Sequence, residues 1–310
     1  MILDKILSTL LEAPSFQTAF IRDRNVLSGH HKTRKISMPN EAMLELHRYL
    51  LRELRFQVAI RGSGLPLSRY SSAGERSDSA VVNALRHRSS RFYYLLDIES
   101  AFPSTNGELL IELLLEHLLD EKEPEAFANA FREYFLDENG GLVVGAPAST
   151  LLFNLFCYFR IDQDIARLCG SYGLLYSRYI DDFTLSHPDQ KIGKGLRRTV
   201  RQVVEKEGFS VSHRKSEVLD RQKGPVTITG VGIQPNGRLF VSRDFTRRVS
   251  GLMHWLTNHP GRGAEFIIAR NRLHGMMGVI RYVAKRSQTS FNRTERKILV
   301  RYRQLQRRLS

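Results

Sequence analysis

The 310-residue sequence predicts a mixed helix-and-strand domain followed by a basic helical domain, and three observations support this prediction. Residues 92–96 are aromatic and apolar, as expected of a buried strand. Residues 174–186 alternate apolar and polar side chains on both sides of a central bend, as a β-hairpin does. Residues 243–310 contain sixteen Lys and Arg against three Asp and Glu, so they carry +13 of the chain's formal charge of +15.

The N-terminal part, residues 1–60, is predicted to be mainly helical. Asn40 is typical of a helix N-cap and favours a helix over residues 41–54. A basic segment at residues 22–35 precedes this helix, and residues 61–80 are rich in Gly, Ser and Arg, as in an exposed loop.

The middle of the chain is predicted to alternate helices and strands. Residues 107–138 carry acidic side chains four positions apart, which indicates one solvated helix face. Residues 141–159 hold no charged residue, but Pro147 and Asn154 among them favour a buried helix over a membrane span. Beyond them we expect a helix at 192–207 and strands at 226–233 and 238–241, joined by a turn at Pro235-Asn236-Gly237.

The composition narrows the class of protein. The chain has 42% hydrophobic and 25% charged residues, and this composition excludes a fibrous, low-complexity or wholly disordered protein. A net charge of +15 indicates a polyanionic partner, and nucleic acid is favoured because no membrane span is expected. The two cysteines, Cys157 and Cys169, form no disulfide framework or zinc site alone, and no secretory signal is recognised, so we expect a cytoplasmic protein.

Three carboxylates stand beside apolar strands, where an unpaired charge is costly. Asp97 follows the strand at 92–96, and Asp181 and Asp182 occupy the bend of the hairpin. Each alone has a structural interpretation, because Asp commonly forms turns at strand ends and in hairpins. Together in a basic chain they match the oxygen ligands that Mg²⁺ prefers, and paired Mg²⁺ ions serve in-line phosphoryl displacement. The pattern therefore predicts nucleotidyl transfer.

Five segments occur in the order and spacing of the motifs of reverse transcriptases, and the chain resembles that family from about residue 30 to its end. They are Tyr-Leu-Leu-Asp-Ile-Glu-Ser-Ala-Phe at 94–102, Gly-Ala-Pro-Ala-Ser at 145–149 followed by Asn154, Tyr-Ser-Arg-Tyr-Ile-Asp-Asp at 176–182, Gly-Phe at 208–209 followed by Lys215, and a hairpin near Gly230 at the place of the family's primer grip.

Within that family, three further elements are similar to those of bacterial retron reverse transcriptases. Asn-Ala-Leu-Arg-His at 83–87 resembles the Asn-Ala-x-x-His element that precedes the first motif. Val-Thr-Ile-Thr-Gly at 226–230 resembles the Val-Thr-Gly element, with inserted residues. Arg-Lys-Ile-Ser-Met-Pro at 34–39 resembles the fingers segment Arg-x-Ile-x-x-Pro.

The resemblance implies an α+β fold with the right-hand polymerase architecture. Fingers would occupy residues 1–90, and a palm with an antiparallel sheet would occupy 91–240, with some fingers segments inserted. A basic helical thumb that binds RNA and the template–primer duplex would occupy residues 241–310.

The resemblance also implies a two-metal active site. Asp97, Asp181 and Asp182, with the backbone carbonyl of Ile98, would hold two Mg²⁺ ions. Phe102 would lie under the incoming sugar as a gate against a 2′-hydroxyl, unless it is plain core. The other expected nucleotide contacts are Lys32, Arg34, Gly145, Pro147 and Lys215. Lys215 would act near the leaving pyrophosphate as a general acid, and Lys32 and Arg34 would bind the triphosphate or simply belong to a basic patch.

Nucleic-acid contacts are implied along the whole chain. Glycine allows the close approach of a backbone, and Arg and Lys bind phosphates. The implied contacts are Asn83, His87, Arg178, Tyr179, Gly230, Gly275, Arg293, Arg296, Lys297, Arg301 and Arg303. For the five C-terminal cations, a solvated helix face is the alternative interpretation.

The sequence also departs from the family pattern. Val144 stands where Gln is usual, Ile180 where Ala or Val is usual, and Ser212 where Asn is usual. The segment Ala-Ser-Thr at 148–150 replaces the usual Thr-Ser-Pro. Because Val144 has no side-chain hydrogen-bonding group, nucleotide selection is expected to differ from that of the family.

The resemblance implies an RNA-directed DNA polymerase of retron type. It would copy part of its own structured noncoding RNA, serving as template and primer, into a branched RNA–DNA hybrid (msDNA) in antiphage defence. Its partners would be that RNA, the DNA product, dNTPs and an effector protein, with no membrane. Two alternatives are another bacterial defence reverse transcriptase, self-primed or making template-poor DNA, and a non-catalytic RNA-binding scaffold.

Overall fold

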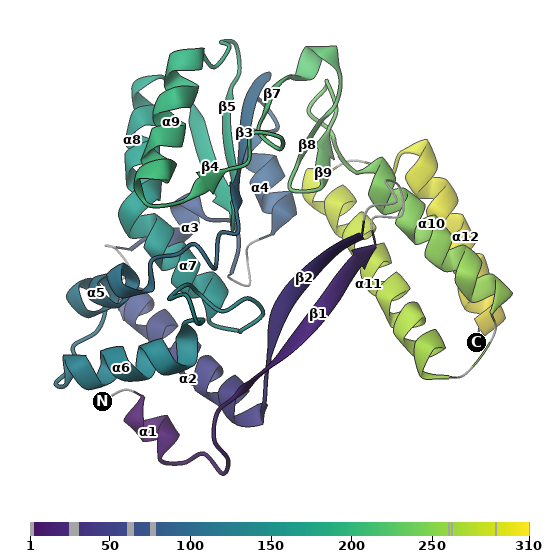
Figure 1. Cartoon of the computed structure of the whole chain (residues 1–310). Helices are drawn as coiled ribbons and strands as arrows, with labels where there is room; N and C mark the ends of the chain where they lie inside the picture. Colours follow the sequence, from purple (N-terminus) through teal and green to yellow (C-terminus); the bar gives the residue numbers. More distant parts are fainter. Residues whose placement is uncertain are drawn as a thin grey trace.

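The centre of the molecule is a five-stranded antiparallel sheet with the order β4–β5–β3–β6, in which β7 also pairs with β3 (Figure 1). The computed structural model describes residues 3–24, 31–60, 65–74, 79–259, 261, 263–288 and 290–309. The sheet strands are β3 (Phe92–Glu99), β4 (Leu175–Tyr179), β5 (Asp182–His187), β6 (Ser210–Val211) and β7 (Glu217–Asp220).

Strand β3 is buried on both of its faces. Tyr94, Leu96 and Ile98 belong to the larger core cluster, whereas Tyr93 belongs to a second cluster. Successive side chains of a strand point to opposite faces, so Asp97 shares the face of Tyr93. The structure confirms the predicted buried strand and the hairpin β4–β5.

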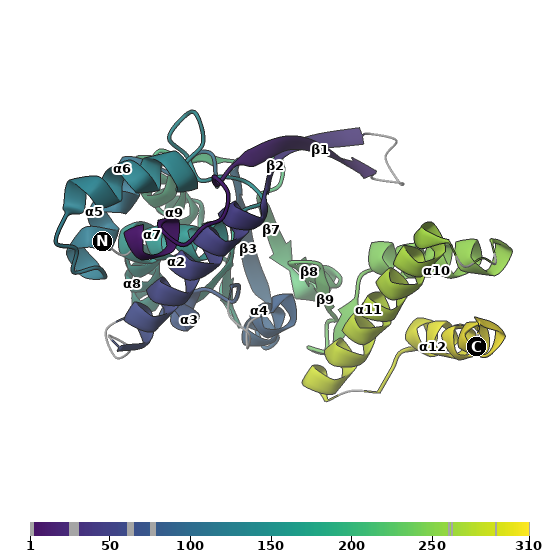
Figure 2. The ribbon, with the colours of Figure 1, turned by 90° about the horizontal axis from the view of Figure 1, so that it is seen from below.

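Helices surround the larger core cluster, which lies between the sheet and the N-terminal half of the chain (Figures 1 and 2). The buried helix expected within residues 141–159 is confirmed for residues 149–159, as α7 and the start of the π-helical segment that continues it, whereas residues 141–148 form the loop before it. The acidic side chains at 108, 112 and 116 line the exposed face of α5. These helices are α1 (Asp4–Leu7), α2 (Glu41–Ile60), α3 (Leu67–Tyr70), α5 (Gly107–His117), α6 (Pro124–Phe135), α7 (Ser149–Cys157), the π-helical segment Tyr158–Asp162, α8 (Gln163–Ser171) and α9 (Lys194–Lys206).

The prediction that residues 1–60 are mainly helical is wrong for residues 16–24 and 31–39. Strands β1 (Phe16–Arg24) and β2 (His31–Pro39) form a two-stranded antiparallel ribbon that extends from the helices. Its side chains are largely solvated where they are described, with Phe20 67% and Met38 54% exposed, so the segment lacks an apolar pattern that would mark it. The helix expected after Asn40 is confirmed, because Asn40 Oδ1 accepts the Met43 N–H at 2.9 Å.

The second core cluster joins the sheet to the C-terminal helices. Helix α4 (Ala80–His87) and the small sheet β10–β9–β8 pack between them. The expected turn is present, since Gly237 N–H donates to the Gln234 carbonyl at 2.8 Å with Gly237 at φ +80°. The elements are β8 (Val226–Ile228), β9 (Val231–Ile233) and β10 (Leu239–Val241), preceded by the 3₁₀ turn Arg221–Lys223, and the helices α10 (Arg243–Asn258), α11 (Ala264–Ser287) and α12 (Arg293–Leu309).

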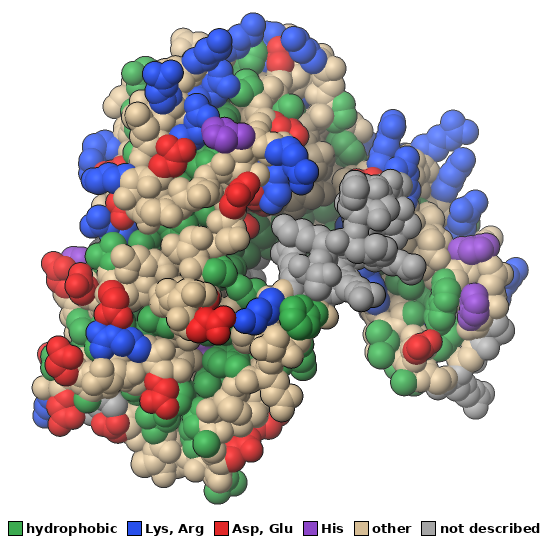
Figure 3. Space-filling model, in the orientation of Figure 1, with side chains coloured by type: hydrophobic (Ala, Val, Ile, Leu, Met, Phe, Trp, Pro, Cys, Tyr) green, Lys and Arg blue, Asp and Glu red, His purple; other side chains and the backbone are tan. Residues whose placement is uncertain are grey.

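Surface charge is divided between the two ends of the molecule. Figure 3 shows Lys and Arg over the C-terminal helices and the top of the sheet, and Asp and Glu gathered below, around α5 and α6. Among the described residues, none of the helices combines the length and the apolar character needed to cross a bilayer.

Candidate active site

The structure brings the three predicted carboxylates to one end of the central sheet. Asp97 near the end of β3 and Asp182 at the start of β5 are direct partners in the strand register. The Ile98 N–H donates to the Asp181 carbonyl at 3.2 Å, which ties the bend between β4 and β5 to β3. Residues separated by more than eighty positions therefore meet because two antiparallel strands pair.

Lys215 joins this group from the loop after β6. Its Nζ donates to Asp97 Oδ1 at 2.6 Å and to Oδ2 at 3.1 Å. The loop is held by the Ser212 N–H, which donates to the Asp97 carbonyl at 2.9 Å. Because the Lys215 side chain is 52% exposed, this ion pair is screened by water and is weak enough to exchange.

The electrostatics at Asp182 are those of a crowded acidic site. The pKa of Asp182 is raised from 3.8 to about 7, chiefly by burial and also by the negative charges of Asp181 and Asp97, while the charge of Lys215 acts in the opposite direction. A cation at this place would relieve the repulsion.

The donors are of the kind that hard divalent cations prefer, but their arrangement is not yet that of a metal centre. Carboxylate oxygens suit Mg²⁺. Among the residues that the structure describes, no three His, Cys, Asp or Glu side chains are grouped closely enough to hold a metal ion as they stand. In this conformation the Lys215 ammonium lies against the Asp97 carboxylate instead.

Three residues of the expected nucleotide site lie on two loops: Phe102 on the turn after β3, and Gly145 and Pro147 on the loop before α7. Phe102 is half-buried, and its ring lies 5.4 Å from the ring of Phe153 on α7. The loop is attached to β2, because the Ser37 N–H donates to the Val144 carbonyl at 2.9 Å. Gly145 has φ +103°, and a Cβ there would lie 3.0 Å from the Ser37 carbonyl, so the close contact with β2 favours glycine.

Comparison with protein families settles the classification. The family model described as reverse transcriptase (RNA-dependent DNA polymerase) matches residues 21–233. The chain belongs to the reverse transcriptase family. The match includes all three carboxylates, Lys215 and the loop at Gly145.

Curated relatives include retron reverse transcriptases. The chain is 28% identical over 240 residues to the Retron Mx65 reverse transcriptase of Myxococcus xanthus, covering 73% of this chain and 54% of that one. It is 24% identical over 266 residues to the Retron Ec86 reverse transcriptase of Escherichia coli, covering 86% of this chain and 78% of that one. The chain thus spans about half the length of the first relative and over three quarters of the second.

Solved structures support the fold. Telomerase from Candida albicans, in complex with a fragment of telomeric RNA, has a TM-score of 0.54 at 13% identity over 96% of this chain and 60% of that chain. Apo telomerase from Candida tropicalis has the same TM-score at 12% identity, over 92% of this chain and 61% of that chain. These similarities confirm the α+β right-hand polymerase fold and nothing finer.

In this chain, the Asn-Ala-x-x-His element packs inside the fold against the central sheet, which corrects the expectation that it contacts nucleic acid. Asn83 and His87 are both 0% exposed. The ring nitrogens of His87 lie 2.6 Å from Ser186 Oγ on β5 and 2.6 Å from Ser177 Oγ on β4. Ser177 Oγ also donates to Asn83 Oδ1 at 2.5 Å. These side chains cannot reach a nucleic acid without unpacking the sheet.

Arg178 also differs from its expected role. It is 0% exposed and pairs with Asp162, which is equally buried, so its side chain faces the protein interior and not a bound nucleic acid. Asp162 is a residue of this site that was not predicted from the sequence. In the sequence, Asp162 is marked by its place soon after the long uncharged segment at 141–159. A carboxylate buried in such surroundings needs a cationic partner.

The remaining predicted contacts lie at the surface or outside the described side chains. Gly230 is exposed at the turn between β8 and β9, with φ +82°, Gly275 is exposed on α11, and Tyr179 and Pro147 are half-buried. Lys32 and Arg34 belong to β2, but their side chains lie outside what the structure describes. Five cations on α12 are all exposed: Arg293, Arg296, Lys297, Arg301 and Arg303.

Proposed function

We propose that this chain is an RNA-directed DNA polymerase of retron type that copies part of a structured RNA into DNA. The observation that carries the proposal is the register pair Asp97–Asp182, with Asp181 beside it and Lys215 in contact. Family membership and the retron relatives support the polymerase reaction.

The active site would work by charge placement. Asp97, Asp181, Asp182 and the Ile98 carbonyl would hold two divalent ions once the Lys215 ammonium leaves Asp97. When bound, such ions supply Lewis-acid stabilisation to the attacking and leaving oxygens of the phosphoryl transfer. Lys215 Nζ would remain protonated until it donates its proton to the departing pyrophosphate.

The nucleotide would lie between β2 and α7. The Phe102 ring packs against the ring of Phe153, so the core holds it in place, and it would form a rigid surface beside the sugar. Gly145 and Pro147 line the start of α7, and Lys32 and Arg34 would bind the triphosphate. The aliphatic Val144 supplies only its backbone carbonyl, which Ser37 already uses.

The C-terminal helices would hold the RNA. Gly230, Gly275 and Tyr179 would contact the template–primer duplex, and the exposed cations of α12 would bind phosphates. The proposed domains are fingers at 1–90, a palm at 91–240 with some fingers segments inserted, and a thumb at 241–310. A branched msDNA product, an effector protein and antiphage defence are part of the same proposal.

A second candidate is a defence reverse transcriptase of another type, which is self-primed or makes template-poor DNA. The observation that favours it is Val144, because an aliphatic side chain at this position cannot hydrogen-bond the incoming nucleotide.

Purification with the genomic neighbourhood distinguishes these functions. The bound nucleic acid is digested separately with RNase and with DNase. A single hybrid, sensitive to both and joined at an internal RNA 2′ position, supports the retron proposal. DNA alone, or DNA linked to protein, supports the second candidate, and RNA alone supports a scaffold.

A further inference from the structure

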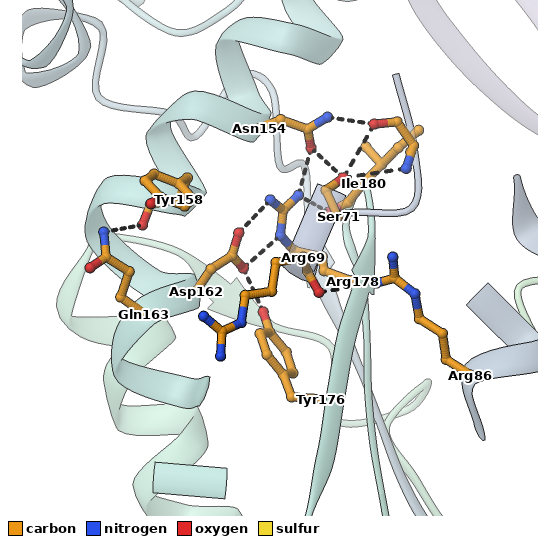
Figure 4. A network of polar contacts seen from close by, with 11 residues as sticks. Arg69, Ser71, Arg86, Asn154, Tyr158, Asp162, Gln163, Tyr176, Arg178 and Ile180 are labelled. Carbon is orange, nitrogen blue, oxygen red and sulfur yellow. Dashed lines mark hydrogen bonds and ion pairs between the residues drawn. The ribbon is translucent and has the colours of Figure 1, made fainter. Parts of the chain in front are cut away.

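Arg178 occupies an unusual position directly before the bend that carries Asp181 and Asp182. It lies on β4, and its side chain and that of Asp162 are 0% and 1% exposed. Arg178 Nε and Nη2 donate to Asp162 Oδ1 and Oδ2 at 2.9 and 2.7 Å, so the two groups form a forked ion pair (Figure 4).

The same guanidinium also holds the bend itself. Arg178 Nη1 donates to the Ile180 carbonyl at 2.9 Å. Ile180 has φ +57°, a left-handed conformation that β-branched residues rarely adopt. Such a conformation persists only where its surroundings enforce it. The hydrogen bond from Arg178 is therefore made to the carbonyl of the strained residue, which immediately precedes Asp181 in the sequence.

Two further side chains, Asn154 and Tyr176, anchor the ion pair. Arg178 Nη1 also donates to Asn154 Oδ1 on α7 at 2.8 Å, and Asn154 Nδ2 donates to the Ala73 carbonyl at 2.8 Å. Tyr176 Oη donates to Asp162 Oδ1 at 2.5 Å. Asp162 ends a π-helical turn, a feature that recurs at functional sites.

We propose that Arg178, fixed by Asp162, is a positioning residue that holds Ile180 in its strained conformation and so sets Asp181 and Asp182 opposite Asp97. This inference rests on the proposed polymerase function. Arg178 acts through the bend and touches no substrate. Lysine cannot replace it, because one ammonium does not span the Asp162 carboxylate and the Ile180 carbonyl with a planar fork.

The test compares three variants of the full chain. Arg178→Lys keeps the charge and removes the fork. Tyr176→Phe removes one hydrogen bond to Asp162 and keeps the ring, so it folds even if Arg178→Lys does not. The matched control is Arg160→Lys, because Arg160 makes a similar fork to Glu207, at 2.8 and 3.2 Å, from the same π-helical turn but away from the bend.

Two readouts separate positioning from ordinary stability. In primer extension with poly(rA)·oligo(dT), Arg178→Lys should lower kcat per active molecule at least tenfold and raise the half-saturating Mg²⁺ concentration several-fold. The primer–template affinity of Arg178→Lys should stay within twofold of that of the unmodified chain. In Tyr176→Phe, kcat should fall about threefold and the half-saturating Mg²⁺ concentration should rise about threefold. Hydrogen exchange should quicken in peptides containing Asp181 and Ile98, since the Ile98 N–H bonds the Asp181 carbonyl. Arg160→Lys should change neither readout.

An unchanged kcat, Mg²⁺ midpoint and exchange rate in Arg178→Lys would overturn the inference. So would equal losses in Arg160→Lys, because both forks would then be merely structural. If the unmodified chain makes no DNA, the proposed function fails, but hydrogen exchange still decides whether Arg178 holds the bend.

Discussion

Acidification should destabilise the fold through His87, which lies on α4 and is buried against the central sheet, between Ser177 and Ser186. Burial lowers the pKa of His87 from 6.5 to about 3. Between these values the unfolded chain binds a proton that the folded chain excludes, so stability falls as the pH drops below 6.5. One pKa unit corresponds to about 1.4 kcal/mol, so going from pH 7 to pH 5 should cost about 2 kcal/mol from His87.

His47 adds a second contribution of the same sign. Burial lowers its pKa from 6.5 to about 4, so it should cost about 2 kcal/mol more over the same interval. The unmodified chain should therefore lose about 4 kcal/mol from its two buried histidines, and His87→Gln should lose about half of that.

Urea unfolding followed by circular dichroism at pH 7 and pH 5 measures both losses. His87→Gln should be less stable than the unmodified chain at pH 7, yet less sensitive to acid. Because the raised pKa of Asp182 acts in the opposite direction over the same interval, the comparison between the two chains carries the test. An undiminished acid loss in His87→Gln would refute the burial argument.

Three further predictions concern function. Phe102→Ala should raise ribonucleotide incorporation relative to deoxynucleotide incorporation in primer extension, whereas an unchanged ratio would make Phe102 plain core. Lys215→Gln should slow single-turnover extension about a hundredfold, in the range of a lost general acid, without weakening primer–template binding; equal rates would exclude that role. The double variant Arg301→Gln/Arg303→Gln should reduce the slope of log affinity against log salt concentration for RNA-hairpin binding, by the equivalent of about one to two phosphate contacts. The control Arg167→Gln on α8 should leave this slope unchanged.

The parts of the site that the sequence predicted are those marked by local pattern. An apolar strand ending at Asp97 and a hairpin around Asp181 and Asp182 are visible in any short window of sequence, and antiparallel pairing then brings the acids together. The resemblance to the family motifs added Lys215, whose Nζ donates a hydrogen bond to the Asp97 carboxylate.

The errors arose where burial depends on distant partners. Asn83, His87 and Arg178 are polar residues that a sequence would place at a nucleic-acid surface, but they form hydrogen bonds with Ser177, Ser186 and Asp162 inside the fold. The ribbon at residues 16–39 was missed because its described side chains are mostly solvated and show no apolar periodicity.

DNA synthesis by Asp97→Asn and Asp181→Asn tests the central claim most directly. Each variant is compared with the unmodified chain on a DNA-primed RNA template with Mg²⁺, and RNA binding is measured in parallel. We expect extension by the unmodified chain and a loss of at least about a thousandfold in each variant, which corresponds to about 4 kcal/mol of transition-state stabilisation, with RNA affinity kept. Robust synthesis by either variant would contradict it.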